Sequence, residues 1–128
     1  MKTTLILTCI IALSPAVAFA DSGPQSEPEA AIEYLLARVA SSDLKFVRNG
    51  KVHAPPEAVK HIHRKYNYYK DRIRTAEDFI ALAATKSMVS GNQYMIISDG
   101  GEQPAADWLK SALAEYRAAN NDAGGSSE

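Results

Sequence analysis

The sequence predicts an α+β domain in which about four helices cover one face of a small antiparallel sheet. Two observations indicate the sheet: an Asn-Gly pair divides residues 45–53 into a hairpin, and a short β-prone run occupies residues 94–98. A third observation indicates the helices, because apolar residues recur every three or four positions in the segments around these strands.

The N-terminus has the pattern of a secretory signal peptide. Lys2 precedes an apolar run at residues 5–13, and residues 18–20 have the small-x-small pattern of a cleavage site. The apolar run is too short to cross a bilayer, so we expect no transmembrane segment there. We predict a signal peptide at 1–20 that is cleaved after Ala20, and a periplasmic location with secretion as the alternative.

Removal of the signal peptide leaves 108 of the 128 residues, which is the size of one domain. The lone cysteine, Cys9, lies within the predicted signal, so we expect no disulfide in the exported chain. Neither end of that chain shows a hydrophobic period. The sequence therefore predicts a flexible leader at 21–28, a single α+β domain at 29–119 and a disordered tail at 120–128.

The domain begins with a predicted helix. Ser26 and Glu29 match a capping box, and Pro28 is compatible with a first helical turn. The polar residues 41–43 end the helix. Its expected buried stripe consists of Ile32, Leu35, Leu36 and Val39.

A hairpin follows, with Asn49 and Gly50 in a type I′ turn that needs positive φ at both central positions. This turn also fixes the register of the two short strands. The expected cross-strand pairs are Arg48 with Lys51, Val47 with Val52, and Phe46 with His53.

Two further helices are predicted after the hairpin. Pro55 and Pro56 start the first of them, and Thr75 with Asp78 forms a capping box for the next, which stops near Gly91. The apolar stripe of the helix that begins at Pro55 consists of Val59, Ile62, Tyr66, Tyr69 and Ile73.

The last β-prone run, at 94–98, is closed by a turn at residues 99–101. The sequence leaves open whether this strand and the hairpin share one sheet. Pro104 suits the first turn of a final helix. One side of that helix consists of Ala105, Trp108, Leu109, Ala112, Leu113 and Tyr116.

Basic residues are concentrated in the middle of the chain. The segment 45–74 contains nine lysines and arginines against Glu57 and Asp71, so its net charge is +7, while the rest of the exported chain carries −9. Several of these residues share the face of the second helix that lies opposite its apolar stripe. Such a face can bind phosphate or carboxylate groups, and it is also what the solvated side of an amphipathic helix looks like. The candidate ligand-binding residues are His61, Arg64, Lys65, Tyr68 and Arg72, together with Arg48 from the hairpin.

Motifs for metal binding or catalysis are absent from the sequence. His61 and His63 are two positions apart, so they point to opposing faces of a helix, and no acidic cluster completes a ligand set around His53. The turn at 99–101 lacks both the ligand run of a calcium loop and the lysine of a phosphate loop. We therefore expect no metal, no other cofactor and no nucleic-acid partner.

Two segments and several single residues form a recognisable series. The segments are Phe46-Val47-Arg48-Asn49-Gly50 and Thr75-Ala76-Glu77-Asp78-Phe79-Ile80, and the accompanying residues are His53, His61, Lys65, Tyr66, Ser90, Gly91, Tyr94, Trp108 and Leu109. The series resembles the YfeK-like proteins, a family of small exported Gram-negative proteins with a domain of unknown function. Gln93 departs from the pattern, in which proline precedes the tyrosine. The resemblance implies a periplasmic α+β domain and no particular activity.

Together these observations favour a non-catalytic binding or interaction module of the cell envelope. Its basic helix face would contact an anionic envelope component or an acidic protein. Two alternatives stay open. One is a small hydrolase that uses His61 or His53 as a general base. The other is a self-associating structural protein, because the charges are segregated along the chain.

Overall fold

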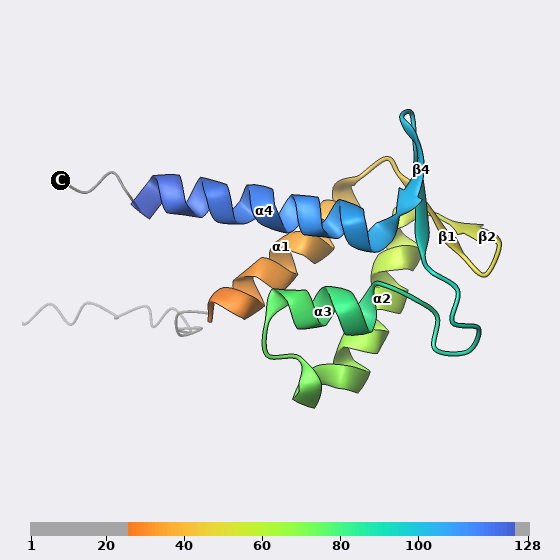
Figure 1. Ribbon diagram of the computed structural model, residues 1–128, viewed down its shortest axis with the longest axis horizontal. Helices are drawn as coiled ribbons and strands as arrows, with labels where there is room; N and C mark the ends of the chain where they lie inside the picture. The colour runs from red at the N-terminus through yellow and green to blue at the C-terminus, as the bar shows by residue number, and fades with distance from the viewer. Residues whose placement is uncertain (1–25, 125–128) are drawn as a thin grey trace, which may run out of the picture.

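The computed structural model describes residues 26–124, so the predicted signal peptide and most of the predicted leader lie outside the described residues (Figure 1). Four helices and a four-stranded sheet make up an α+β fold, as the sequence predicts. The elements in chain order are α1 (Glu27–Ser41), β1 (Lys45–Arg48), β2 (Lys51–His53), α2 (Pro55–Tyr69), the 3₁₀ turn η1 (Lys70–Arg72), α3 (Ala76–Ala83), β3 (Met95–Ser98), β4 (Gly101–Pro104) and α4 (Ala105–Gly124).

The sheet is antiparallel throughout, with the strand order β2-β1-β3-β4. The predicted hairpin register is confirmed, and Asn49 and Gly50 have φ angles of 51° and 77°, as a type I′ turn requires. β1 also pairs with β3, with Phe46 opposite Ile96, so the hairpin and the later strand share one sheet.

The fourth strand, β4, was not predicted from the sequence. Its residues, Gly101–Pro104, include no β-branched or aromatic side chain, so nothing in their composition indicates a strand. The strand forms because the turn after Ser98 returns the chain along the open edge of β3. Pro104 therefore ends β4 and stands just before α4, in place of its predicted position in the first turn of that helix.

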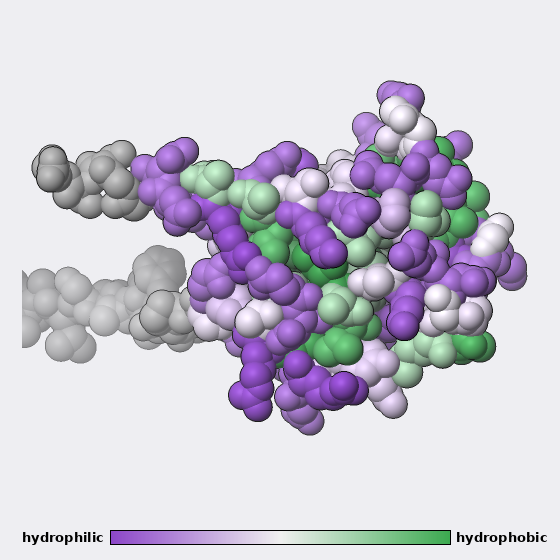
Figure 2. Space-filling model, in the orientation of Figure 1, coloured by the Kyte–Doolittle hydropathy of each residue, from purple (hydrophilic) through white to green (hydrophobic). Residues whose placement is uncertain are grey.

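The four helices pack together on one side of the sheet, as Figure 1 shows. The largest fully buried side chains come from three helices and the sheet: Phe79, Leu35, Ile80, Ile96, Leu109 and Val39. Of these, Leu35, Val39 and Leu109 belong to the predicted helical stripes. In Figure 2 hydrophilic side chains cover most of the helical surface, with apolar atoms visible between the helices.

Helix ends show both correct and wrong predictions. The Thr75 capping box is present, with Asp78 N–H donating to Thr75 Oγ1 at 3.0 Å and Thr75 N–H donating to Asp78 Oδ2 at 3.2 Å. Ser26 does precede α1, but its side chain makes no cap hydrogen bond, so the predicted capping box with Glu29 is wrong.

α3 is shorter than predicted, because it ends at Ala83 and not near Gly91. Thr85 Oγ1 donates to the Ile80 carbonyl at 2.7 Å and helps to terminate the helix. The following segment, 84–94, is a closed loop with a bridge between Lys86 and Gln93, and Gly91 has a φ of 73° within it. At the other end of the chain, α4 continues past Asn120 to Gly124.

Candidate functional site

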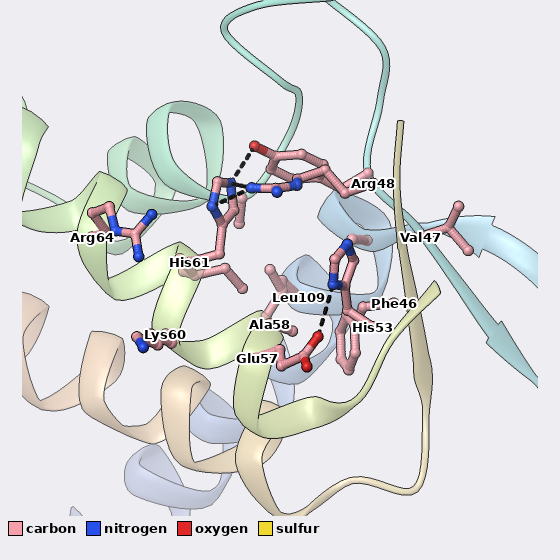
Figure 3. A pocket seen from close by; sticks show the side chains of 14 residues that line it. Phe46, Val47, Arg48, His53, Glu57, Ala58, Lys60, His61, Arg64 and Leu109 are labelled. Carbon is pink, nitrogen blue, oxygen red and sulfur yellow. Dashed lines mark hydrogen bonds and ion pairs between the residues drawn. The ribbon is translucent and has the colours of Figure 1, made fainter. Parts of the chain in front are cut away.

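A pocket of about 210 Å³ lies between the first hairpin, α2 and the start of α4 (Figure 3). Its floor is apolar and includes Phe46, Ala58, Ile62 and Leu109. Its rim is basic and consists of Arg48, His53, Lys60, His61 and Arg64. Among the described residues, Glu57 provides the only acidic side chain on the lining. A cavity with an apolar floor and a few convergent polar groups is the usual form of a small-molecule site.

Local periodicity brings these side chains together. In β1, Phe46 and Arg48 are two residues apart and therefore point to the same face of the sheet, toward α2. In α2, the pairs Glu57 with His61 and Ala58 with Ile62 are four residues apart, so both helical rows face the strand.

The chemistry of the rim centres on one hydrogen-bond network. Arg48 Nη1 lies 2.6 Å from His61 Nδ1, and His61 Nε2 lies 2.9 Å from Tyr94 Oη (Figure 3). An arginine can only donate, so Nδ1 must be the acceptor and Nε2 must carry the proton that it donates to Tyr94. Lys65 Nζ completes the network by donating to the Tyr94 hydroxyl at 3.3 Å and to the Lys86 carbonyl at 2.7 Å.

The position of Lys65 contradicts the prediction of a solvent-exposed face. Only 7% of this residue is exposed, and its ammonium group lies 5.0 Å from the centre of the Tyr94 ring. The reason is tertiary: Lys86 and Tyr94, both in the loop 84–94, pack over that part of α2, and helical phase alone could not show it. The loop is thereby held to the helix by a charge-assisted hydrogen bond.

Burial and like charge shift the ionisation of the network. Burial, and then the positive charges of Arg48 and Lys65, lower the pKa of His61 to about 4, so this histidine is neutral at pH 7. Burial also lowers the pKa of Lys65, with a further contribution from Arg48, and it raises the pKa of Tyr94. The His61 and Lys65 shifts reflect positive charges that are partly withdrawn from water, whereas burial raises the pKa of Tyr94 against the opposing effect of Arg48.

The lysines and arginines in and behind the pocket lining have no paired carboxylate among the described residues. The ion pairs within residues 26–124 join Arg38 to Glu115, His53 to Glu57, and Arg117 to both Glu27 and Glu77. In this part of the chain no carboxylate is paired with Arg48, Lys60, Arg64 or Lys65. Lys65 is buried and Arg48 is half-buried, and such charges in proteins are normally paired, so these two residues favour an anion as the missing partner.

A second polar pair lies at the pocket mouth. His53 Nδ1 is 2.9 Å from Glu57 Oε2, four residues later in the chain (Figure 3). Within residues 26–124, Nε2 of the same ring is buried without a hydrogen-bond partner. His53 was predicted as an alternative general base without a carboxylate partner, and the structure supplies Glu57 as that partner.

The predicted ligand-binding residues therefore separate into two groups. Arg48, His61 and Arg64 line the pocket, and Lys65 lies behind them against Tyr94. The other two residues, Tyr68 and Arg72, remain in solvent: Tyr68 is 73% exposed, and the Arg72 guanidinium lies 5.9 Å from the Tyr69 ring. Tyr94 and Phe46 were not predicted as site residues, because the sequence does not show which strand and loop pack against α2.

The described residues contain neither a metal-binding cluster nor a membrane-spanning helix. Between residues 26 and 124 no three histidine, cysteine or acidic side chains gather in a way that could hold a metal ion. None of the helices in the same range is long and apolar enough to cross a membrane.

Comparison with known proteins confirms the family. The model of the Family of unknown function (DUF5329) matches residues 26–117, which is most of the chain. The Uncharacterized protein YfeK of Salmonella typhimurium (strain LT2) is 43% identical over 67 residues. That match covers 52% of this chain and 56% of YfeK, so the chain spans little more than half the length of this curated relative. No solved structure matches.

Proposed function

For this chain, which belongs to the DUF5329 family of unknown function, we propose a role as a binding protein for a small organic anion that carries an apolar group. The anionic group would occupy the basic rim of the pocket, and the apolar group would rest on its floor. This proposal keeps the predicted anionic partner and moves its contact from the outer face of α2 to the pocket.

The observation that carries the proposal is the unpaired positive charge at Arg48 and Lys65. Removing a charge from water costs several kcal/mol unless an opposite charge or good hydrogen bonds offset the penalty. In the described part of the chain, Lys65 donates to the Lys86 carbonyl and the Tyr94 hydroxyl, and Arg48 has only the neutral His61 ring as a side-chain partner. A bound carboxylate or phosphate would supply the charge that the protein itself does not.

The pocket lining also indicates how such a molecule would bind. The guanidinium of Arg48 can hold a carboxylate or phosphate by two parallel hydrogen bonds. Lys60 and Arg64, on the exposed side of α2, would attract the anion from solution. Phe46 and Leu109 would contact its apolar part. The volume of about 210 Å³ sets an upper limit on that part and favours short chains or single rings.

The test is a calorimetric titration with matched probes: hexanoate, phenyl phosphate, and hexanol as the neutral analogue. We expect both anions to bind and hexanol to bind at least about tenfold more weakly, because a charge-assisted contact is worth roughly 1.5–3 kcal/mol. Arg48→Gln should weaken anion binding by a similar factor. Arg72→Gln is the matched control, because Arg72 carries the same charge outside the pocket, and it should bind as the wild type does.

Two results would contradict the proposal. One is equal binding of hexanol and hexanoate, because the rim would then contribute nothing. The other is equal loss of binding in Arg48→Gln and Arg72→Gln, because the anion would then respond only to overall charge.

A second candidate function is hydrolysis with His53 as the general base. The His53–Glu57 pair favours it, because a carboxylate orients an imidazole in many hydrolases. His61 is a poorer candidate, since Arg48 and Tyr94 already use both of its ring nitrogens. The discriminating experiment is turnover of p-nitrophenyl acetate by wild type and His53→Gln. Equal rates in both proteins would exclude this function for His53.

We also propose that the chain is exported to the periplasm. The apolar run and the small-x-small site at residues 18–20 support this location. N-terminal sequencing of the protein recovered from a periplasmic extract should begin at Asp21. Recovery in the cytoplasmic fraction with Met1 intact would contradict it.

A further inference from the structure

The face of the sheet that points away from the helices is unusually apolar. Strand side chains alternate between the two faces, so Phe46 and Ile96 point into the core while Val47, Met95 and Ile97 point outward. Figure 3 shows Val47 directed away from the pocket, on the opposite side of its strand from the residues that face α2. The described helices lie on the other side of the sheet (Figure 1). An open antiparallel face is normally polar, so this composition calls for a partner.

The strand register arranges these outward side chains in two rows across the sheet. One row is apolar on all four strands and runs Val52, Val47, Met95, Pro104. The other row crosses three strands and runs Lys45, Ile97, Glu102. Val52 is 57% exposed and Ile97 is 37% exposed. Figure 2 shows apolar side chains gathered at this end of the molecule with hydrophilic ones around them.

We propose that this face binds a second copy of the chain through a two-fold axis that runs along β3 and lies in the interface. Such an axis exchanges the two sides of β3. It places Lys45 of one copy opposite Glu102 of the other, and the reverse, with Ile97 against Ile97 between them. In the apolar row the same operation places Val47 opposite Pro104 and Met95 opposite Met95.

The charge pattern selects a second copy over other occupants. Lys45 and Glu102 stand on either side of Ile97, so the face carries one charge of each sign at equal offsets from β3. A polyanion or an anionic membrane would gain from the lysine and be repelled by the glutamate. A copy of the same face complements both charges at once. Sheets pack about 10 Å apart, a gap that a lysine and a glutamate can span together.

The size of the face sets the strength of the interaction. Four strands spaced about 4.8 Å apart, each with about four residues, form a face roughly 14 Å wide and 13 Å long. This is smaller than the roughly 800 Å² that each partner contributes to a standard stable interface. We therefore expect a dimer that forms at micromolar to millimolar concentration and dissociates on dilution.

Sedimentation velocity over about 10 µM to 1 mM protein tests this dimer, because a small interface should dissociate within that range. Lys45→Glu places like charges in both symmetric contacts and should weaken dimerisation at least about tenfold, and Glu102→Lys should do the same. The double variant Lys45→Glu/Glu102→Lys restores opposite charges across the axis and should return to within about threefold of the wild type. Lys110→Glu is the control, because it changes net charge equally at an exposed position of α4.

Three outcomes would overturn the proposal: a monomer at every concentration, dimerisation that Lys45→Glu does not weaken, or a double variant that dimerises no better than the single ones. The pocket lies on the other side of the sheet, so Arg48→Gln should leave dimerisation unchanged. Anion binding and dimerisation can therefore fail separately.

Discussion

The basic strip, which is the row formed by His61, Lys65, Tyr68 and Arg72 on α2 and η1, looks uniform in the sequence, but its two ends differ in the structure. His61 and Lys65 are enclosed by Arg48, Tyr94 and the loop after α3, and hydrogen bonds join them into one network. Tyr68 and Arg72, two turns further along, lie in solvent. Helical phase therefore identifies a row of residues, and the strand and loop packed against that row determine which of them join one hydrogen-bond network.

The largest expected difference between the two ends is in stability. Lys65→Ala would remove the hydrogen bond to the Lys86 carbonyl and the packing of the buried lysine stem, so we expect a loss of about 2–4 kcal/mol in unfolding free energy. Arg72→Ala should change it by less than about 0.5 kcal/mol, as exposed substitutions usually do. Urea denaturation of both variants measures the difference. Equal losses would mean that the strip is uniform after all.

Acid should lower the unfolding free energy through His61, which belongs to the enclosed end of the basic strip. The pKa of His61 is about 4 in the folded protein and 6.5 without its surroundings, so between these values the unfolded chain binds a proton that the folded protein does not. The contribution of the neutral His61 ring to the unfolding free energy is therefore fully present above about pH 6.5, and it is lost as the pH falls toward 4. Because the ring is only partly buried, we expect a loss on the order of 1–2 kcal/mol.

Denaturation at pH 7 and pH 4.5 checks this linkage with two histidine variants. His61→Gln should remove most of the decline, whereas His63→Gln, at an exposed position two residues away, should keep it. A decline of the same size in His61→Gln and wild type would assign the effect to other groups.

The two tyrosines provide a smaller and more conservative comparison. Tyr94→Phe removes only the hydroxyl that joins His61 and Lys65, and we expect a loss of about 1–2 kcal/mol. Tyr68→Phe removes a hydroxyl from a residue that is 73% exposed and should have almost no effect. Thermal unfolding of the pair at pH 7 gives the difference directly, and a null result for Tyr94→Phe would show that the network contributes little.

Local sequence rules predicted much of this fold. The Asn49–Gly50 turn fixed the hairpin register, and the Thr75 capping box located the start of α3, because both depend on a few adjacent residues. β4 and the early end of α3 were missed, because they depend on contacts with other parts of the chain: the open edge of β3 for the strand, and the pairing of residues 85–86 with 93–94 for the segment that follows the helix.

The site residues likewise include some that local patterns predicted and some that they did not. Arg48, His61 and Arg64 were identified from charge and helical spacing, and all three line the pocket. The burial of Lys65 and the role of Tyr94 could not be foreseen, since the loop 84–94 contacts α2 only in the tertiary structure. The concentration of basic residues along the sequence thus identified the basic region. Which of these residues line a pocket and which stay in solvent could be seen only in the tertiary structure.

The most direct test of the account is to map hexanoate binding on the ¹⁵N-labelled protein by amide chemical shifts. If the anion binds in the pocket, the shifts should saturate and cluster at residues 46–48, 57–62 and 94, with residues 68–74 unchanged. Shifts centred on 68–74, or small shifts spread evenly over all basic residues, would contradict it. They would show that the exposed end of the strip, or charge alone, attracts the anion.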